Sequence, residues 1–315
     1  MTPYDSVAVA ESRASLLARL SKFLRRHRSW IGFVFIFPWL VSVLWFDAFP
    51  FLLNVYFSFT DYSVGTRIPN WIGLENYQQV FGGDHLVPVS LKNTAYYVGL
   101  SVPLSIVFAF SLALLLNLDV PGRSVYRTIY YIPSIVPAVA ASIIWLIMFR
   151  THNGLVNQLL SLVGLGPVPW LTRPEWAKPA LIVMSLWGFG GQLVIYLAGL
   201  QGVPVELYEA AEIDGAGSWR KLLHVTIPMM TPVIFFNLIM GIIGAFQVFT
   251  SAFIMTNGGP LNSTLFYMLH LYNNAFAYYR MGYASAMALV LFCIILAFTL
   301  LLNSSSERWV YYGGG

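Results

Sequence analysis

Six long apolar stretches dominate the 315-residue sequence and restrict what it can fold into. They lie near residues 30–58, 92–117, 127–149, 178–200, 226–255 and 283–303. About 20 helical residues, each rising about 1.5 Å, cross the roughly 30 Å hydrocarbon core of a bilayer. With 58% hydrophobic and only 10% charged residues, the chain has more apolar surface than one soluble core could cover. The sequence therefore predicts an all-α integral membrane protein with six transmembrane helices.

The distribution of lysine and arginine orients the predicted bundle. If the N-terminus lies inside the cell, the segments on that side carry 11 of these residues and the outer segments carry 6. Cytoplasmic loops are enriched in both residue types, so we predict an N-in, C-in topology. Few charges interrupt the stretches themselves. In the first stretch Asp47 is expected close to the outer end, between Pro38 and Pro50.

One membrane domain with short extensions is the simplest organisation, because the sequence contains neither a long linker nor a low-complexity tract. Residues 1–28 are predicted to form a basic amphipathic segment on the cytoplasmic membrane surface. Residues 29–90 would hold the first transmembrane helix and an outer loop. Residues 91–303 would form the core of the membrane domain, and residues 304–315 a cytoplasmic tail.

The cytoplasmic segment 204–228 has an unusual charge for a loop next to lipid headgroups. Its first half carries four acids, Glu206, Glu209, Glu212 and Asp214. Anionic headgroups would repel such a cluster. The segment is therefore predicted to face another protein.

Local signals predict a helix, a turn and a second helix within this segment. Pro204 suits the first position of a helix, and acids are favoured in the first turn. Residues 214–217, Asp-Gly-Ala-Gly, would end that helix, because glycine readily adopts the left-handed conformation. Ser218 is predicted to cap the second helix. The small side chains of Ala210 and Ala211 would let this part of the chain press close to a partner.

The same segment resembles the EAA loop of binding-protein-dependent ABC importers. The family pattern is Glu-Ala-Ala, three residues, Gly, nine residues and then Ile-x-Leu-Pro. The similar positions here are residues 209–211, Gly215 and residues 227–228, with one residue of the last part missing. Residues 73–77, Gly-Leu-Glu-Asn-Tyr, also look like the family's segment after the first span. The sequence is most similar to the first permease of the maltose, trehalose and glycerol-phosphate type systems.

The resemblance implies a type I ABC importer permease fold with a cytoplasmic coupling helix, in a multi-pass protein of a prokaryotic plasma membrane. It also implies four kinds of partner besides membrane lipid: a second homologous permease, two cytoplasmic ATPase subunits, an extracytoplasmic solute-binding protein and a carbohydrate substrate. ATP and magnesium would be bound by the ATPases, with no cofactor in this chain. The residues implied to couple the chain to its ATPase are Glu206, Glu209, Ala210, Ala211, Asp214 and Gly215.

Several chemistries lack their residues in this sequence. No lysine follows a glycine, so the Gly-x-x-x-x-Gly-Lys-[Ser/Thr] loop that cradles ATP phosphates is absent. The five histidines are scattered and form no zinc motif. The basic residues form no single patch suited to nucleic acid. We therefore predict a non-catalytic membrane subunit without a metal site. A secondary transporter or channel that works without an ATPase is the alternative.

Candidate substrate contacts are polar or aromatic residues predicted near the middle of the membrane. Ionisable residues within membranes usually mark proton or ion paths, and the predicted spans hold almost none. A neutral, hydroxyl-rich substrate could be bound by amides, hydroxyls and aromatic rings instead. Ala245 and Val248 stand where the related maltose permease has asparagines, so the resemblance does not imply a particular sugar. The candidate pathway residues are Ser134, Trp187, Gly188, Gly191, Gln192, Phe246 and Gln247.

Overall fold

The computed structural model describes residues 28–65, 68–119 and 121–311, and the chain divides into two compact units. The first unit ends at Tyr56 and the second begins at Phe57. Residues 57–90, which the sequence grouped with the first span, therefore lie in the second unit. The predicted basic segment 1–28 falls outside the described residues except for Arg28.

The described part of the first unit is one helix interrupted by a wide turn. Its parts are α2 (Arg28–Ser42), the π-helical turn η1 (Val43–Ala48) and the start of α3 (Phe49–Ser58). Pro50 has no N–H group to donate to the carbonyl of Phe46. The amide of Phe49 donates to the carbonyl of Leu44, five residues earlier, so the hydrogen-bond pattern widens just before Pro50. Residues Phe35–Ser58 are long and apolar enough to cross a membrane.

Three helical segments of the second unit meet the same criteria. They are α5 (Leu86–Asn117), the segment Ser218–Met255 and α16 (Met281–Ser306). The middle segment is built from α12 (Ser218–Lys221), the π-helical turn η3 (Leu222–Thr226), α13 (Ile227–Phe246) and α14 (Thr250–Met255).

The third and fourth predicted spans are pairs of helices with a bend between them. The pairs are α6 (Arg123–Ile135) with α7 (Ala138–Met148), bent by 99°, and α9 (Pro174–Trp187) with α10 (Gly190–Gln201), bent by 49°. Val136 is extended because Pro137 disfavours helical backbone in the residue before it. Gly188 lies at the other break. If each pair is one span, the described residues contain the six predicted spans, but two of these are not continuous helices.

α5 is the central helix of the second unit. It packs against α9, α10, α13 and the short helix α15 (Tyr267–Tyr272). Three buried apolar clusters contain parts of it, and Val87 belongs to the one with Tyr267 and Tyr283. Tyr97 belongs to a cluster with Trp145 and Phe266, and Ala113 belongs to another with Tyr196. The mostly apolar composition of the bundle thus leaves a packed interior beside α5 and an apolar exterior suited to lipid.

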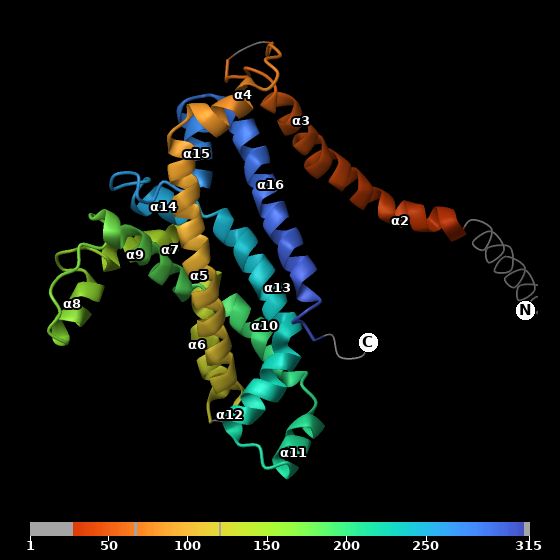
Figure 1. Cartoon of the computed structure of the whole chain (residues 1–315), viewed down its shortest axis with the longest axis vertical. Helices are drawn as coiled ribbons and strands as arrows, with labels where there is room; N and C mark the ends of the chain where they lie inside the picture. Colours follow the sequence, from red (N-terminus) through yellow and green to blue (C-terminus); the bar gives the residue numbers. More distant parts are fainter. Residues whose placement is uncertain (1–27, 66–67, 120, 312–315) are drawn as a thin grey trace, which may run out of the picture. The chain divides into compact units, whose positions relative to one another are not determined.

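Several short helices of the second unit lie near its two ends (Figure 1). Near the end where α5 and α16 begin lie α4 (Glu75–Gln78), the π-helical turn η2 (Gln79–Gly83), α15 and the π-helical turn η4 (Asn273–Ala277). At the opposite end lie α11 (Val205–Ile213) and α12. The short helix α8 (Leu155–Leu162) lies between α7 and α9 in the chain. The predicted topology assigns the first end to the outside and the second to the cytoplasm.

Candidate functional site

Residues 204–221 form the helix–turn–helix that their sequence predicts. Two details differ from the prediction. Pro204 precedes α11 as its N-cap residue instead of occupying the first helical position. Ser218 is the first residue of α12, and Gly217 before it is the N-cap, because Gly217 adopts the extended backbone that this position needs. We call α11, the turn 214–217 and α12 the elbow.

Hydrogen bonds in the turn explain the spacing between Ala211 and Gly215. The amide of Ala216 donates to the carbonyl of Ala211 at 2.8 Å, and the amide of Gly215 donates to the carbonyl of Glu212 at 2.9 Å. These two bonds form a Schellman motif, which requires a left-handed residue after the helix. Gly215 supplies it with a φ of +74°. A Cβ atom at Gly215 would meet no atom within 4 Å, so the requirement is one of backbone conformation and not of space.

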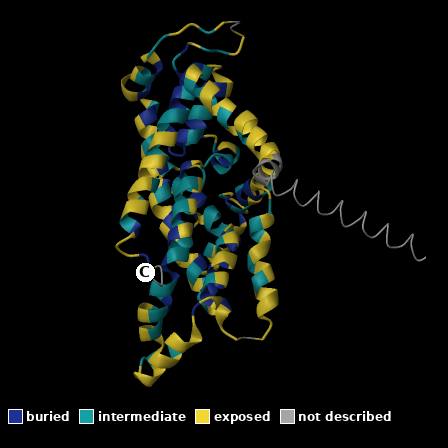
Figure 2. Cartoon of the chain, turned by 90° about the vertical axis from the view of Figure 1, so that its right-hand side faces the viewer, coloured by how far each residue is buried: buried dark blue, intermediate teal, exposed yellow. Residues whose placement is uncertain are grey.

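The elbow is coloured mostly as exposed (bottom of Figure 2), and its exposed residues include both apolar and acidic ones. No residue of α11 or α12 is buried. Ile213 and Trp219 are 88% and 75% exposed. Glu206 and Glu209 are exposed too, and neither takes part in a hydrogen bond or ion pair within the part of the chain that the structure describes. Exposed apolar groups of this size beside unpaired acids are typical of a surface that contacts another protein.

One side-chain contact attaches the elbow to the membrane bundle, and a second joins its two helices. The hydroxyl groups of Tyr208 on α11 and Thr226 in η3 are hydrogen bonded at 3.0 Å. Lys221 on α12 donates to Glu212 on α11 at 2.6 Å. This hydrogen bond and the positive charge of Lys221 hold the pKa of Glu212 below its usual value. Movement of α11 would therefore reach α13 through the continuous helical backbone of α12 and η3. The six predicted coupling residues all lie on α11 or in its turn.

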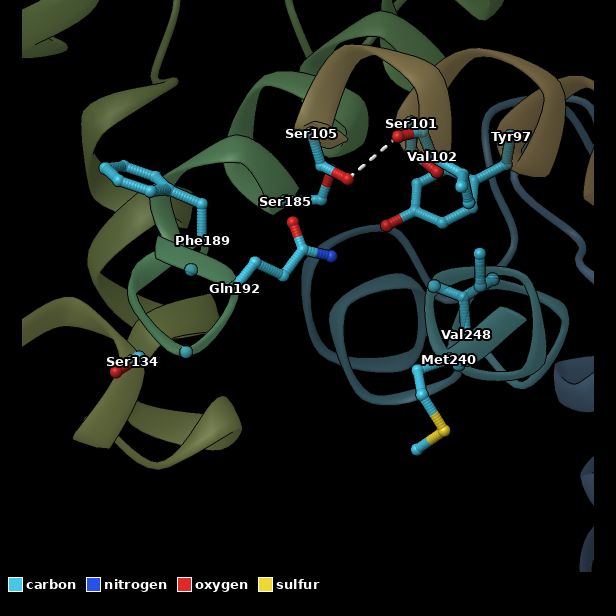
Figure 3. Close-up of a pocket in the computed structure, with 15 residues that line it drawn as sticks. Tyr97, Ser101, Val102, Ser105, Ser134, Ser185, Phe189, Gln192, Met240 and Val248 are labelled. Atoms are coloured by element: carbon cyan, nitrogen blue, oxygen red, sulfur yellow. Dashed lines mark hydrogen bonds between the residues drawn. The ribbon is translucent and has the colours of Figure 1, made fainter. Parts of the chain in front are cut away.

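A cavity of about 470 Å³ lies between α5, the α6 end, the α9–α10 break and α13 (Figure 3). Four of the predicted pathway residues line it together: Ser134, Gly188, Gly191 and Gln192. Ala245 and Val248 line it as well. No charged side chain lines this cavity, so it suits an uncharged polar molecule better than an ion.

The polar groups of this cavity differ in how well they are hydrogen bonded. The hydroxyls of Ser134 and Ser185 donate to backbone carbonyls of their own helices at 2.7 Å. The hydroxyl of Ser101 and the side-chain carbonyl of Gln192 are buried, and neither has a partner among the described residues. An unpaired buried polar group costs free energy. A change of conformation or a bound molecule that pairs these two groups would recover that free energy.

The other three predicted pathway residues lie elsewhere. Trp187 lines a second cavity of about 470 Å³, beside Trp145 and Phe189, and Phe189 lines both cavities. Phe246 is buried and packs on Phe298 with ring centroids 5.3 Å apart. Gln247 is exposed and donates to the carbonyl of Ile243 at 3.1 Å.

Three hydroxyl-bearing lining residues from α5 were missed by the sequence analysis, whose candidates all lie in the third to fifth spans. Tyr97, Ser101 and Ser105 line the first cavity (Figure 3). They are spaced four residues apart and therefore share one face of a helix. That spacing of hydroxyl groups in an otherwise apolar stretch is the signal that could have found them.

The outer end of the second unit contains a buried polar cluster, which we call the outer cluster. One carboxylate oxygen of Asp84 accepts hydrogen bonds from His270 at 2.8 Å and Tyr283 at 2.9 Å. The other oxygen accepts from the amide of Leu86 at 2.9 Å. Burial opposes ionisation of Asp84, but these hydrogen bonds outweigh it and hold its pKa below the ordinary value. The described residues contain no group of His, Cys, Asp and Glu suited to a metal ion.

Comparison with known proteins supports a transport role. Residues 101–310 match the family described as the binding-protein-dependent transport system inner membrane component. The chain is 42% identical over 285 residues to the probable ABC transporter permease protein YesP of Bacillus subtilis (strain 168), covering 89% of this chain and 92% of YesP. It is 33% identical over 287 residues to the trehalose/maltose transport system permease protein MalF of Thermococcus litoralis, covering 89% and 95%.

A solved structure shares the fold over almost the whole chain. It is a crystal structure of a bacterial ABC transporter involved in the import of the acidic polysaccharide alginate, with a TM-score of 0.78 and 25% identity over 92% of this chain and 99% of that one. The alginate transporter has also been solved in complex with an alginate pentasaccharide-bound periplasmic protein, with a TM-score of 0.78 and 26% identity over 92% and 98%. The predicted fold class and the resemblance are thereby confirmed. The chain belongs to the family of binding-protein-dependent transport system inner membrane components, multi-pass membrane permeases with the type I ABC importer fold.

Proposed function

We propose that this chain is the permease subunit of an ATP-driven carbohydrate importer and couples to a separate ATPase through its elbow. The observation that carries the coupling proposal is that no residue of α11 or α12 is buried, although Ile213 and Trp219 are large and apolar. Such a surface gains free energy when a partner removes it from water. The chain has no phosphate-binding loop, so ATP and magnesium would bind to the partner.

Within the elbow, the proposed coupling residues have two different tasks. Glu206, Glu209 and Asp214 would offer unpaired carboxylates to donors on the ATPase. Ala210 and Ala211 would let the partner approach the helix closely, because a methyl group is the smallest side chain beyond hydrogen. Gly215 would fix the angle between α11 and α12 through its left-handed backbone. Closure of the ATPases would then push α11 and turn α13, which lines the cavity.

The substrate we propose is a neutral or mostly uncharged carbohydrate, such as a di- or oligosaccharide. The name of the trehalose/maltose relative supports this class, whereas the alginate transporter supports only a carbohydrate, because alginate is acidic. The cavity supports it because its polar lining consists of hydroxyl and amide groups. Ser134, Gly188, Gly191 and Gln192 would face the substrate directly, and Trp187 would reach it only through the adjoining cavity. Phe246 and Gln247 lie outside both cavities and have less support.

The complete importer would contain a second permease related to this chain, two cytoplasmic ATPase subunits and an external solute-binding protein. The alginate transporter supports the last of these, since it was solved with a periplasmic protein that carries a pentasaccharide. This chain would line one half of the translocation pathway. Its membrane-spanning helices would face lipid wherever no partner covers them.

Charge reversal at Glu209 tests the coupling proposal. In the assembled complex in proteoliposomes, Glu209→Lys should lower both ATP-driven uptake of labelled sugar and binding-protein-stimulated ATP hydrolysis by at least about tenfold, because reversing one charge of an interface pair costs 1.4 kcal/mol or more. Maltose, trehalose and lactose form a suitable first panel of substrates.

Glu307→Lys is the matched control. Glu307 is an exposed acid outside the elbow, and its replacement changes the net charge by the same amount. It should leave coupling intact. Unchanged coupling in Glu209→Lys would show that the elbow does not transmit closure. Uptake by this chain without any ATPase would instead support a secondary transporter or channel.

A further inference from the structure

A row of hydroxyl groups runs along one side of α6. They belong to Ser124, Thr128, Tyr131 and Ser134. Residues three or four positions apart lie on the same face of a helix, so these four side chains form a continuous line. We call them the hydroxyl stripe. It follows most of the length of α6, the first half of a broken span.

The hydroxyl stripe leads from the cytoplasmic end of the bundle to the first cavity. Near its start, Arg127 donates to the carbonyl of Leu116 at 3.1 Å, so the beginning of α6 is held beside the end of α5. At the other end, Ser134 lines the cavity. A Cβ atom at Gly190 would lie only 2.9 Å from the hydroxyl oxygen of Ser134, so α6 touches α10 there. From Ser124 to Ser134 the stripe covers about 15 Å.

The middle of the stripe is uncovered within the described residues of the second unit. No residue of α6 is buried, and Tyr131 is 41% exposed. The hydroxyl of Thr128 donates to the carbonyl of Ser124 at 2.9 Å, but the hydroxyl of Tyr131 has no hydrogen bond among the described residues. A hydroxyl group without a partner costs free energy in hydrocarbon. This side of α6 is therefore suited to water and not to lipid.

Another side of α6 has the opposite chemistry. Val125 and Ile132 are 59% and 49% exposed. Each follows a residue of the stripe by one position, so it points about 100° away from that residue. Apolar side chains exposed in this way suit lipid or an apolar partner. One helix thus presents two uncovered surfaces that require different surroundings.

We propose that the hydroxyl stripe lines a water-filled exit route, along which a sugar leaves the first cavity toward the cytoplasm. The proposal rests on the proposed function, which supplies the substrate and the direction of transport. The stripe continues the chemistry of the cavity, where the hydroxyl of Ser101 is buried, at 5% exposure of the residue, and has no partner among the described residues. Hydroxyl groups along the route would replace hydrogen bonds that the sugar gives up with water.

The accessibility of single cysteines tests this route. Cys293 is the only cysteine of the chain, so Cys293→Ser provides a background without thiols. In that background, Thr128→Cys and Val125→Cys are compared in the assembled, nucleotide-free complex in inside-out vesicles. A membrane-impermeant methanethiosulfonate is added from the cytoplasmic side, and the rate at which it labels this chain is measured. Thr128→Cys should react at least about tenfold faster, because the reactive thiolate forms in water and is disfavoured in apolar surroundings.

Depth alone would give the reverse order, because Val125 lies nearer to the start of α6 than Thr128 does. Tyr131→Cys with Ile132→Cys as its control repeats the comparison one turn deeper. Sugar uptake by each variant before labelling shows that its complex is folded. Labelling should then lower ATP-driven uptake at least about tenfold in Thr128→Cys, because the attached group blocks the route, and leave uptake unchanged in Val125→Cys.

Equal labelling rates on the two sides of α6, in complexes that still import sugar, would overturn the exit route and leave the proposed function standing. Fast labelling of Thr128→Cys that leaves uptake unchanged would also overturn the route, because a lining position cannot carry the added group without obstructing the sugar. A wild-type complex without ATP-driven sugar uptake would instead overturn the proposed function.

Discussion

Polar side chains are buried and hydrogen bonded at one end of the second unit and exposed and unpaired at the other. At the outer end, Asp84 accepts three hydrogen bonds, and two of its partners, His270 and Tyr283, are only 3% and 2% exposed. At the opposite end, Glu206 and Glu209 of the elbow are exposed and unpaired within the described residues. The two ends therefore have different tasks.

The difference follows from what each end must do without a partner. The outer cluster joins the start of α5 to α15 and α16, segments that are far apart in the sequence, so its hydrogen bonds stabilise the fold itself. Groups that are already paired gain little from a further contact. The exposed acids and apolar side chains of the elbow have contacts still to make. Substitutions at the outer end should therefore change stability, and substitutions at the elbow should change coupling.

The largest stability effect is expected for Asp84→Ala. It should lower the free energy of unfolding in detergent by about 3 kcal/mol, because it leaves the buried His270 and Tyr283 without their acceptor. A chemical or thermal unfolding curve of the purified chain measures this loss. Asp119→Ala is the matched control, since Asp119 is 95% exposed in its pair with Arg123, and should cause no measurable change. Equal losses of unfolding free energy in Asp84→Ala and Asp119→Ala would contradict the stabilising role of the outer cluster.

Lowering the pH should remove the same stabilisation from the wild type. The pKa of Asp84 is below its ordinary value of 3.8 in the folded protein. The ionised carboxylate therefore contributes stability that is fully present above that value and is lost as the pH falls through the lower, folded pKa. The difference in melting temperature between the wild type and Asp84→Asn should shrink below about pH 4. A difference that grows with acidity would contradict the hydrogen-bond assignment.

A smaller effect, confined to the elbow, is expected for Gly215→Ala. A Cβ in the left-handed conformation costs about 1–2 kcal/mol, although nothing crowds it. Amide hydrogen exchange over residues 205–216 should become faster while the melting temperature of the bundle stays constant. Gly217→Ala is the control, because Gly217 has φ −70° and ψ 170°, which alanine adopts freely. A drop in bundle stability in Gly215→Ala would show that the elbow supports the fold.

The sequence predicted the elbow well because its determinants are local. The signals are a proline before α11, an acid in its first turn and a glycine after it. They act over a few residues, and the hydrogen bonds that end the helix join neighbouring residues. The bundle was also predictable, because hydropathy over about 20 residues reports whether a helix can lie in lipid. The prediction missed that Gly217 and not Ser218 caps α12, since either residue type suits that position.

Long-range pairing could not be predicted in the same way. Asp84 and His270 are 186 residues apart, and nothing in either neighbourhood identifies the other. The 99° bend between α6 and α7 depends on Pro137, but a proline within an apolar stretch does not by itself predict a bend, because proline within a membrane helix is often tolerated. The face of α5 that lines the cavity could not be predicted for a different reason. Its hydroxyls lie in an apolar run, and hydropathy averages over all faces of a helix.

The smallest effect is expected for Lys221→Gln, which breaks the ion pair of the elbow. The carboxylate of Glu212 is 63% exposed in that pair, so water and salt screen the attraction, and the melting temperature should not change measurably. The hydrogen-exchange rate of α11 should change less than in Gly215→Ala, because the Schellman bonds remain. Freed Glu212 would join the unpaired acids of the elbow, so any consequence of this variant should appear in coupling to the ATPase. A melting temperature lowered as far as in Asp84→Ala would show that the elbow, like the outer cluster, holds the fold together.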